Sequence, residues 1–127
     1  MEFSESALMI LYAKLRNSWS RETADKNYRD RWTPENRAWG QCAVTAAVVQ
    51  DFFGGDVFRV HDKDSKNIHY YNHIEGKDLD LTVEQYGENI PVWAGKPTNA
   101  NGIMSSFTRK SKRYALLKKG LEQSPNS

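Results

Sequence analysis

The sequence has little of several features that would assign a chain to a special class of protein. One cysteine in 127 residues excludes an internal disulfide and any zinc or iron–sulfur site built from several cysteines. No apolar run approaches the ~20 residues that cross a bilayer, and the N-terminus lacks the basic, then apolar, then small-residue pattern of a secretory leader. We therefore expect a soluble, cytoplasmic protein without membrane association.

The sequence is rich in aromatic residues instead. Trp, Tyr and Phe make up 12% of the chain, while all hydrophobic residues together make up 39%. Disordered chains are normally poor in aromatics, and 127 residues correspond to one ordinary domain. We expect a single domain over residues 1–120 whose core depends on large rings, followed by a flexible tail over residues 121–127.

Apolar spacing predicts three helices. The first covers residues 8–15, and a long loop with aromatic anchors follows over residues 19–37. Residues 43–53 are apolar on almost every side, which predicts a central, buried helix that ends at Gly54. The third is a basic amphipathic helix docked on the core near the C-terminus. Its apolar positions are Phe107, Tyr114, Leu117 and Leu121.

The middle of the chain predicts a small antiparallel sheet. Residues 57–60, 68–74 and 77–82 have the composition of strands, and Glu75-Gly76 is a typical hairpin turn. Residues 91–102 are rich in Gly, Pro and Asn, so we expect irregular structure there. Together with the helices, this order predicts an α+β fold in which the central helix packs on the sheet.

The single cysteine, Cys42, falls in the first turn of the predicted buried helix. Unpaired backbone N–H groups and the positive end of the helix dipole favour a thiolate at that point. The same N–H groups could hold a developing oxyanion on a substrate carbonyl, and Gly40 would let a substrate approach closely. The alternative is a small buried hydrophobe, since free cysteines are among the most buried residues.

A nucleophilic cysteine needs a base and an orienting group, and the predicted hairpin contains candidates for both. If Glu75-Gly76 is a two-residue turn, Ile74 pairs with Lys77. Asp80 then lies diagonal to His69 on the same face, about 7–8 Å away between backbones. A register slip by one residue would break this relation. His73, on the same face as His69, is the alternative base.

The histidines are poor candidates for metal ligands. Four residues along a strand separate His69 from His73 by about 13 Å, which is too far to chelate one ion. The acids that follow His61 resemble the start of a calcium loop, but Lys66 stands where a ligand is expected. We expect no metal and no cofactor.

Several motifs, taken in order, resemble the YunG-like proteins, a small bacterial family. The likeness spans roughly residues 8–118. The matching runs are Ser18-Trp19-Ser20 with Thr23, Gly40-Gln41-Cys42-Ala43-Val44-Thr45-Ala46 through Asp51 and Gly54-Gly55, His69-Tyr70-Tyr71-Asn72, Asp80-Leu81-Thr82 with Gln85, and Arg113-Tyr114 before Leu116-Leu117.

The order of Cys-helix, His-strand and acid-strand is also similar to papain-like and NlpC-like cysteine hydrolases. That similarity implies a papain-like/NlpC-like core in which Cys42 is the nucleophile, His69 the base and Asp80 its orienting group. Papain carries an oxyanion-binding glutamine before its cysteine, and Gln41 is the candidate here. Trp39, Tyr71 and Trp93 are candidate groove walls.

These residues predict a cysteine-dependent amide or peptide hydrolase, or an acyl transferase, that forms a thioester with a peptide-like or amide substrate. The alternative is a non-catalytic binding module of the same fold. The segment 105–127 contains six basic residues and one acidic residue. The segment 1–104 contains twelve basic residues and fifteen acidic ones. The basic segment could contact an anionic partner, although the aromatics form no recognisable nucleic-acid module. The basic residues are Arg109, Lys110, Lys112, Arg113, Lys118 and Lys119.

Overall fold

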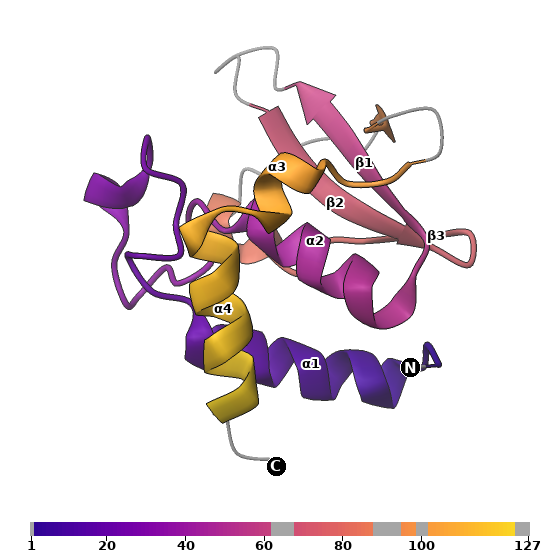
Figure 1. Ribbon diagram of the computed structural model, residues 1–127, viewed down its shortest axis with the longest axis horizontal. Helices are drawn as coiled ribbons and strands as arrows, with labels where there is room; N and C mark the ends of the chain where they lie inside the picture. The colour runs from indigo at the N-terminus through magenta and orange to yellow at the C-terminus, as the bar shows by residue number, and fades with distance from the viewer. Residues whose placement is uncertain (1, 62–67, 88–94, 99–101, 124–127) are drawn as a thin grey trace.

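The computed structural model describes residues 2–61, 68–87, 95–98 and 102–123. The fold is α+β, with one antiparallel sheet and helices on one side of it (Figure 1). The sequence predictions for Trp93 and for most of residues 91–102 lie outside the described residues. The described α-helices are α1 (Glu5–Ser18), α2 (Cys42–Phe53), α3 (Ser106–Arg109) and α4 (Lys112–Gln123).

The sheet contains four described strands in the order β3-β2-β1-β4, and every neighbouring pair is antiparallel. Lys96 and Pro97 form the edge strand within a segment for which the sequence predicted irregular structure. The prediction was wrong there because two residues are too few to leave a periodic pattern, and their pairing with β1 is set by tertiary contact. The strands are β1 (Asp56–His61), β2 (Ile68–Ile74), β3 (Lys77–Leu79) and β4 (Lys96–Pro97).

The β2–β3 hairpin has the predicted register. Glu75 and Gly76 both have positive φ, at 50° and 79°, as the tight two-residue hairpin turn requires. Ile74 therefore pairs with Lys77, and the ladder continues to Leu79. The strand stops there, so Asp80 is the first residue after β3.

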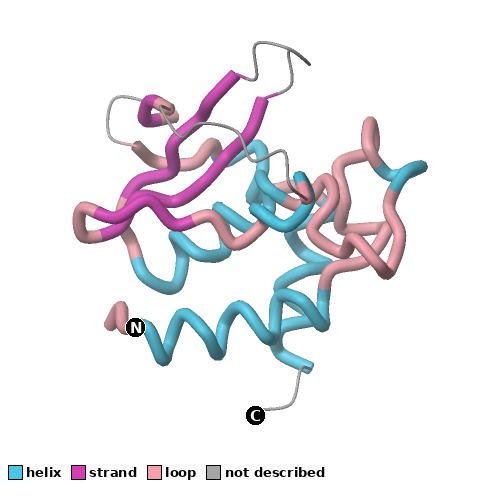
Figure 2. The backbone as a smooth tube through the Cα atoms, turned by 180° about the vertical axis from the view of Figure 1, so that it is seen from behind, coloured by secondary structure: helices cyan, strands magenta, loops and turns pink. Residues whose placement is uncertain are grey.

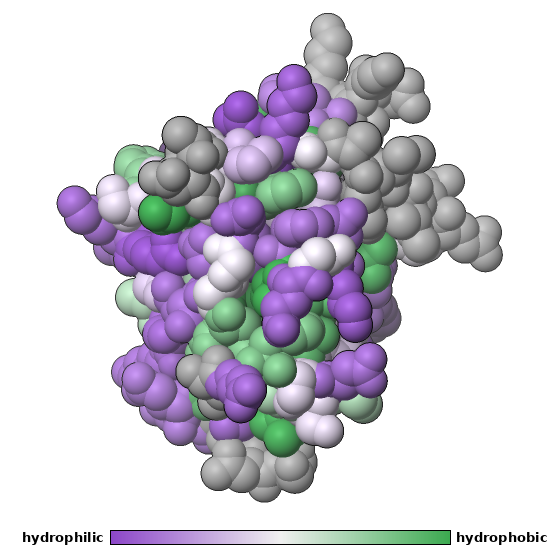
Figure 3. All heavy atoms as spheres, turned by 90° about the vertical axis from the view of Figure 1, so that its right-hand side faces the viewer, coloured by the Kyte–Doolittle hydropathy of each residue, from purple (hydrophilic) through white to green (hydrophobic). Residues whose placement is uncertain are grey.

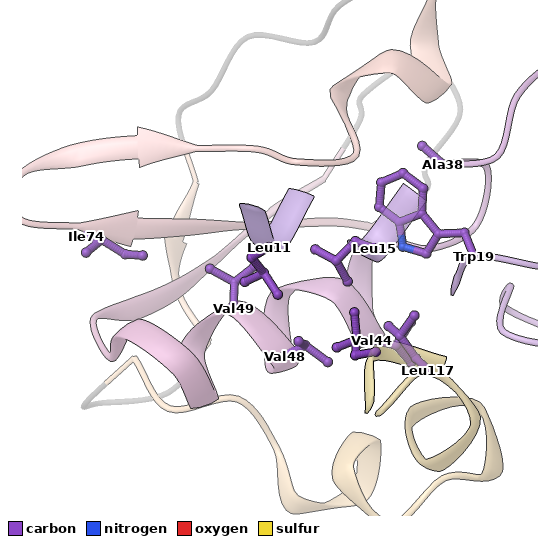
Figure 4. Close-up of a cluster of buried hydrophobic side chains, with 10 residues drawn as sticks. Leu11, Leu15, Trp19, Ala38, Val44, Val48, Val49, Ile74 and Leu117 are labelled. Atoms are coloured by element: carbon purple, nitrogen blue, oxygen red, sulfur yellow. The ribbon is translucent and has the colours of Figure 1, made fainter. Parts of the chain in front are cut away.

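The core lies around α2, between the sheet and the pair formed by α1 and α4 (Figure 1). Residues from all these elements meet in one cluster, and Figure 4 shows their side chains pointing toward one another. Trp19 joins this cluster from the loop after α1 and donates its indole N–H to Thr45 Oγ1 at 2.9 Å. The labelled members are Leu11, Leu15, Trp19, Ala38, Val44, Val48, Val49, Ile74 and Leu117.

The loop between α1 and α2 lies at the end of the molecule away from the β2–β3 turn (Figures 1 and 2). Its tryptophans hold it in place through their indole N–H groups. Trp32 donates to the carbonyl of Arg37 at 3.0 Å, and Trp39 donates to the carbonyl of Tyr28 at 2.8 Å. The loop therefore has a defined shape up to the residue where α2 begins.

The C-terminal segment differs from the single docked helix that the spacing predicted. The chain forms α3 and α4 with a break at Lys110 and Ser111, where Ser111 Oγ caps the second helix by accepting from Tyr114 N–H. Leu117 and Leu121 are buried as predicted, but Phe107 is 83% exposed. Phe107 lies in the separate four-residue helix α3, so it does not share a face with the apolar residues of α4. Its helical spacing from those residues therefore did not predict that it is buried. Helix α4 also continues to Gln123, past residue 121 where we expected a tail.

None of the helices in the described ranges is long and apolar enough to span a membrane. On the face shown in Figure 3, hydrophobic side chains gather near the middle, between hydrophilic ones.

Candidate functional site

Cys42 is the first residue of α2, and its side chain is partly exposed. The first N–H group that bonds back along this helix is that of Thr45, which donates to the carbonyl of Gln41 at 3.0 Å. The backbone N–H groups of Cys42, Ala43 and Val44 come before this first hydrogen bond of the helix. They are therefore placed to stabilise negative charge beside the sulfur.

The backbone before Cys42 takes a shape that only glycine adopts easily. Gly40 has φ +74°, and a Cβ added there would lie 3.2 Å from the Cβ atoms of both Ala24 and Tyr28. The carbonyl of Gly40 also accepts from the N–H of Asp25 at 2.9 Å. The turn into α2 is thus packed directly against the preceding loop.

His69 lies in β2 and is only 2% exposed. Its Nε2 is 2.6 Å from Oδ2 of Asp80, and the two side chains are 3% and 5% exposed. Cys42 acts on the same ring, since a side-chain hydrogen bond from Cys42 and its negative charge are among the causes that raise the pKa of His69. Because Asp80 occupies Nε2, Nδ1 is the ring nitrogen available to the sulfur. One imidazole therefore links the cysteine of α2 to the aspartate after β3.

The pKa of His69 reflects these contacts. Burial by itself lowers the pKa, since it disfavours the charged ring. The hydrogen bonds to Asp80 and Cys42 and the negative charges of both groups act in the opposite direction and raise the pKa from 6.5 to about 9. The imidazolium is thus the favoured form of His69 at neutral pH.

Asp80 is held by residues that follow it in the chain. Its second oxygen, Oδ1, accepts from the backbone N–H of Thr82 at 3.0 Å and from Thr82 Oγ1 at 3.1 Å. Thr82 Oγ1 accepts in turn from Gln85 Nε2 at 3.0 Å, and Gln85 Oε1 accepts from the N–H of Gly40 at 3.4 Å. The hydrogen bonds therefore run from Asp80 back to the turn that precedes Cys42.

Sequence reasoning assigned no role to Thr82 or Gln85, although both stand in the motifs that carried the family resemblance. The signal that could have found Thr82 is local, because an aspartate two residues before a threonine is typical of a turn in which the carboxylate binds the backbone. Gln85 had no such signal, since its partner Gly40 is 45 residues away.

Gln41 is fully buried, and both ends of its side-chain amide bind the loop after α1. Oε1 accepts from Thr23 Oγ1 at 2.8 Å, and Nε2 donates to the carbonyl of Ser20 at 2.9 Å. These bonds join the loop to the start of α2.

Trp39 packs within the loop before α2, whereas Tyr71 lies beside His69 on β2. Trp39 packs edge-on against Tyr28, with ring centroids 5.7 Å apart. Tyr71 is 2% exposed and stacks with His69 at 6.4 Å between centroids, and its hydroxyl accepts from the N–H of Gly95 at 3.0 Å. Tyr71 therefore supports the histidine ring.

His73 forms a second histidine–aspartate pair on β2. Its Nδ1 is 2.6 Å from Oδ1 of Asp78, and its ring stacks on Phe58 at 4.7 Å. Both side chains of this pair are about one-third exposed, at 32% and 39%. Cys42 is among the groups that raise the pKa of His69, so His69 is the histidine that this fold brings near the cysteine.

Two members of the basic C-terminal cluster bind within the chain. Arg109 donates Nε to Asp51 Oδ1 at 3.0 Å, and its other nitrogens bind Gln50 and the carbonyl of Met104 at 2.8 Å. Arg113 donates to the carbonyl of Thr23 at 3.4 Å. These contacts tie α3 and α4 to the rest of the fold.

Across residues 2–61, 68–87, 95–98 and 102–123, no group of three or more His, Cys, Asp or Glu side chains is placed to hold a metal ion.

The fold and these contacts define an α+β protein in which a cysteine at a helix N-terminus is joined through a histidine to an aspartate. The chain belongs to the YunG family, because the family described as "YunG protein" matches residues 7–125. It is 44% identical over 72 residues to "Uncharacterized protein YunG" of Bacillus subtilis (strain 168). That match covers 57% of this chain and 56% of the relative's length. No solved structure matches the chain.

Proposed function

We propose that the protein is a cysteine-dependent amide or peptide hydrolase, or an acyl transferase, with Cys42 as nucleophile, His69 as base and Asp80 as the group that orients His69. The observation that carries this proposal is that His69 Nε2 lies 2.6 Å from Asp80 Oδ2, while Cys42 acts on the same ring and raises its pKa. The same arrangement supports a core related to papain-like and NlpC-like hydrolases, in which a cysteine at a helix start meets a histidine from a strand.

The first step is transfer of the thiol proton from Cys42 to His69. The resulting imidazolium is stabilised by Asp80, whose charge and hydrogen bond contribute to a pKa of about 9 for His69, although burial of the ring acts against this rise. Asp80 keeps its orientation because Thr82 binds its other oxygen. The thiolate is the reactive form of cysteine, so the pair holds the nucleophile ready at neutral pH.

In the second step, the sulfur attacks the carbonyl carbon of an amide. The C=O electron pair moves to oxygen, where the free N–H groups of the first turn of α2 stabilise the oxyanion. When the oxyanion collapses, the C–N bond breaks and His69 gives its proton to the leaving amine. An acyl thioester on Cys42 and a neutral His69 remain.

The thioester is resolved by a second nucleophile. His69 takes a proton from water, the oxygen attacks the thioester carbon, and the C–S bond breaks to release a carboxylic acid and the Cys42 thiolate. If an amine takes the place of water, the acyl group is transferred instead. The proposal covers both outcomes, since the same three residues perform each step.

Alkylation of Cys42 by iodoacetamide tests the proposal, with the rate at pH 7 followed by mass spectrometry. We expect fast labelling of the wild-type chain and a rate about tenfold or more lower in His69→Gln, because the imidazolium no longer stabilises the thiolate. His73→Gln is the matched control, since His73 lies on the same strand with its own aspartate partner. It should label at the wild-type rate.

A second measurement tests the thioester. p-Nitrophenyl acetate should add one acetyl group to the chain, located at Cys42 by peptide mapping and absent in Cys42→Ser at equal exposure. The acetyl group should be lost more slowly in His69→Gln than in His73→Gln. Slow alkylation that does not depend on His69, together with no acetylation at Cys42, would overturn the proposed function.

A further inference from the structure

A cavity of about 580 Å³ lies between β1, β2 and the chain that leads into α3. Its volume is within the range of roughly 300–1,000 Å³ that holds small organic ligands. The wall combines one cation, one phenol, three hydroxyls and three apolar side chains. These residues are Arg59, Tyr70, Thr98, Ser105, Thr108, Ile103, Met104 and Phe107.

The apolar part of this wall is open to solvent. Phe107 is 83% exposed and Ile103 is 52% exposed, while Met104 behind them is buried at 4%. Large apolar side chains that gather at an exposed cavity often mark a binding surface. Phe107 in particular is not needed by the core, because α3 places it away from α4.

The cavity reaches the neighbourhood of Cys42 through Tyr70. Tyr70 lines the cavity, and both Tyr70 and Ala43, the residue after Cys42, pack against the hydrophobic cluster that contains Met104. Burial raises the pKa of Tyr70, and the charge of Cys42 raises it further. Tyr70 therefore links the cavity to the part of α2 that follows Cys42.

Arg59 supplies the charge of the cavity. It lies on β1, is exposed, and forms a side-chain hydrogen bond with Tyr70. A guanidinium has five N–H donors, so the contact with one phenol leaves donors that can bind a carboxylate in the cavity. The cavity thus combines an aromatic surface with an anion-binding group.

We propose that this cavity is the substrate subsite and that it takes a residue with a large apolar side chain and a free C-terminal carboxylate. The side chain packs on Phe107 and Ile103, and the carboxylate pairs with Arg59. As a substrate assignment this rests on the proposed function, because the acyl group on the amide nitrogen of that residue would lie toward Cys42. The chemical class is an N-acyl amino acid, or a peptide that ends in an aromatic or branched apolar residue.

Binding without turnover tests the subsite in the full chain carrying Cys42→Ala. N-acetyl-L-phenylalanine and N-acetyl-L-phenylalanine amide are titrated separately by NMR, since the two probes differ only in the carboxylate. We expect the acid to bind about two- to fivefold more tightly than the amide, as an exposed ion pair would give. Arg59→Gln should remove this preference and leave binding of the amide unchanged.

Two further variants locate the ligand. Phe107→Ser should weaken binding of both probes by a similar factor, whereas Lys110→Gln, which removes an exposed cation outside the cavity, should change neither. Equal binding of acid and amide, a preference that survives Arg59→Gln, or no binding of either probe would overturn the subsite.

These outcomes are independent of catalysis. If both probes bind as expected but Cys42 of the wild-type chain is inert toward iodoacetamide, the subsite stands and the proposed function fails. If Cys42 reacts as proposed but the acid has no advantage, the function stands and the subsite fails.

Discussion

Asp80 is the residue directly after β3, and its Oδ2 lies 2.6 Å from Nε2 of His69. The hairpin register decides this contact. Ile74 pairs with Lys77, so the chain leaves the ladder after Leu79 and turns Asp80 toward the histidine. A register one residue different would present another side chain, because successive residues of a strand face opposite sides.

We predict that Asp80→Asn slows the alkylation of Cys42. The amide keeps the size of the carboxylate but removes the negative charge that stabilises the imidazolium of His69, so the rate at pH 7 should fall about three- to tenfold. The measurement is the iodoacetamide rate from pH 5 to 10. Asp78→Asn is the control, since Asp78 binds His73 in the same way but is partly exposed. An equal effect of the two substitutions would contradict this assignment.

We predict that folding stability falls as the pH rises past 6.5. Burial lowers the pKa of His69, but Asp80 and Cys42 raise it overall from 6.5 to about 9. The folded state thus holds this proton more tightly than the unfolded state. The contribution of His69 to folding stability is fully present below pH 6.5, decreases above that value and is lost once the pH passes about 9.

The size of this loss follows from the shift. A change of this extent in one pKa corresponds to about 3 kcal/mol of unfolding free energy. Urea unfolding at pH 6, 8 and 10 measures it, and the same series on His69→Gln separates His69 from other groups that titrate in this range. The variant should lose less stability than the wild type between pH 6 and 10. Parallel curves would show that His69 does not account for the change.

We predict that Arg109 acts as a structural tie between α2 and α3. Its side chain donates to Asp51, Gln50 and the carbonyl of Met104 at 2.8–3.0 Å. Arg109→Ala should therefore lower the free energy of unfolding by about 2 kcal/mol, in line with several hydrogen bonds from one charged group. Lys110→Ala, at the exposed neighbouring position, should change it by less than about 0.5 kcal/mol. The measurement is urea denaturation followed by circular dichroism, and equal effects would contradict this role.

The local patterns predicted most of the elements that carry the candidate site. The apolar run after Cys42 defined a buried helix because its hydrophobic residues occupy every side, and the Glu75-Gly76 turn defined the hairpin because Gly76 readily adopts the positive φ that such a turn requires. The contact of His69 with Asp80 followed from that register. These predictions succeeded because each depends on neighbours within about ten residues.

Other features depend on contacts between distant parts of the chain. Periodicity grouped Phe107 with Leu117, yet a capping serine between them begins a new helix and leaves the ring exposed. Gln41 stands next to Cys42 in the sequence, which made it the candidate oxyanion-binding residue. In the structure, the Gln41 side chain binds the loop after α1. Neither outcome can be predicted from spacing alone, because each is set by which segments pack together.

The sequence by itself determined the single thiol, its place at a helix start and the register of the hairpin that brings Asp80 to His69. Tertiary structure alone decided that His69 rather than His73 meets Cys42, and that Thr82, Gln85 and Gly40 connect Asp80 to the turn before the cysteine. The physical reason is that hydrophobic periodicity records which side of an element is buried. The partner of a polar side chain depends instead on how whole elements dock, and that is set only when the core around α2 has packed.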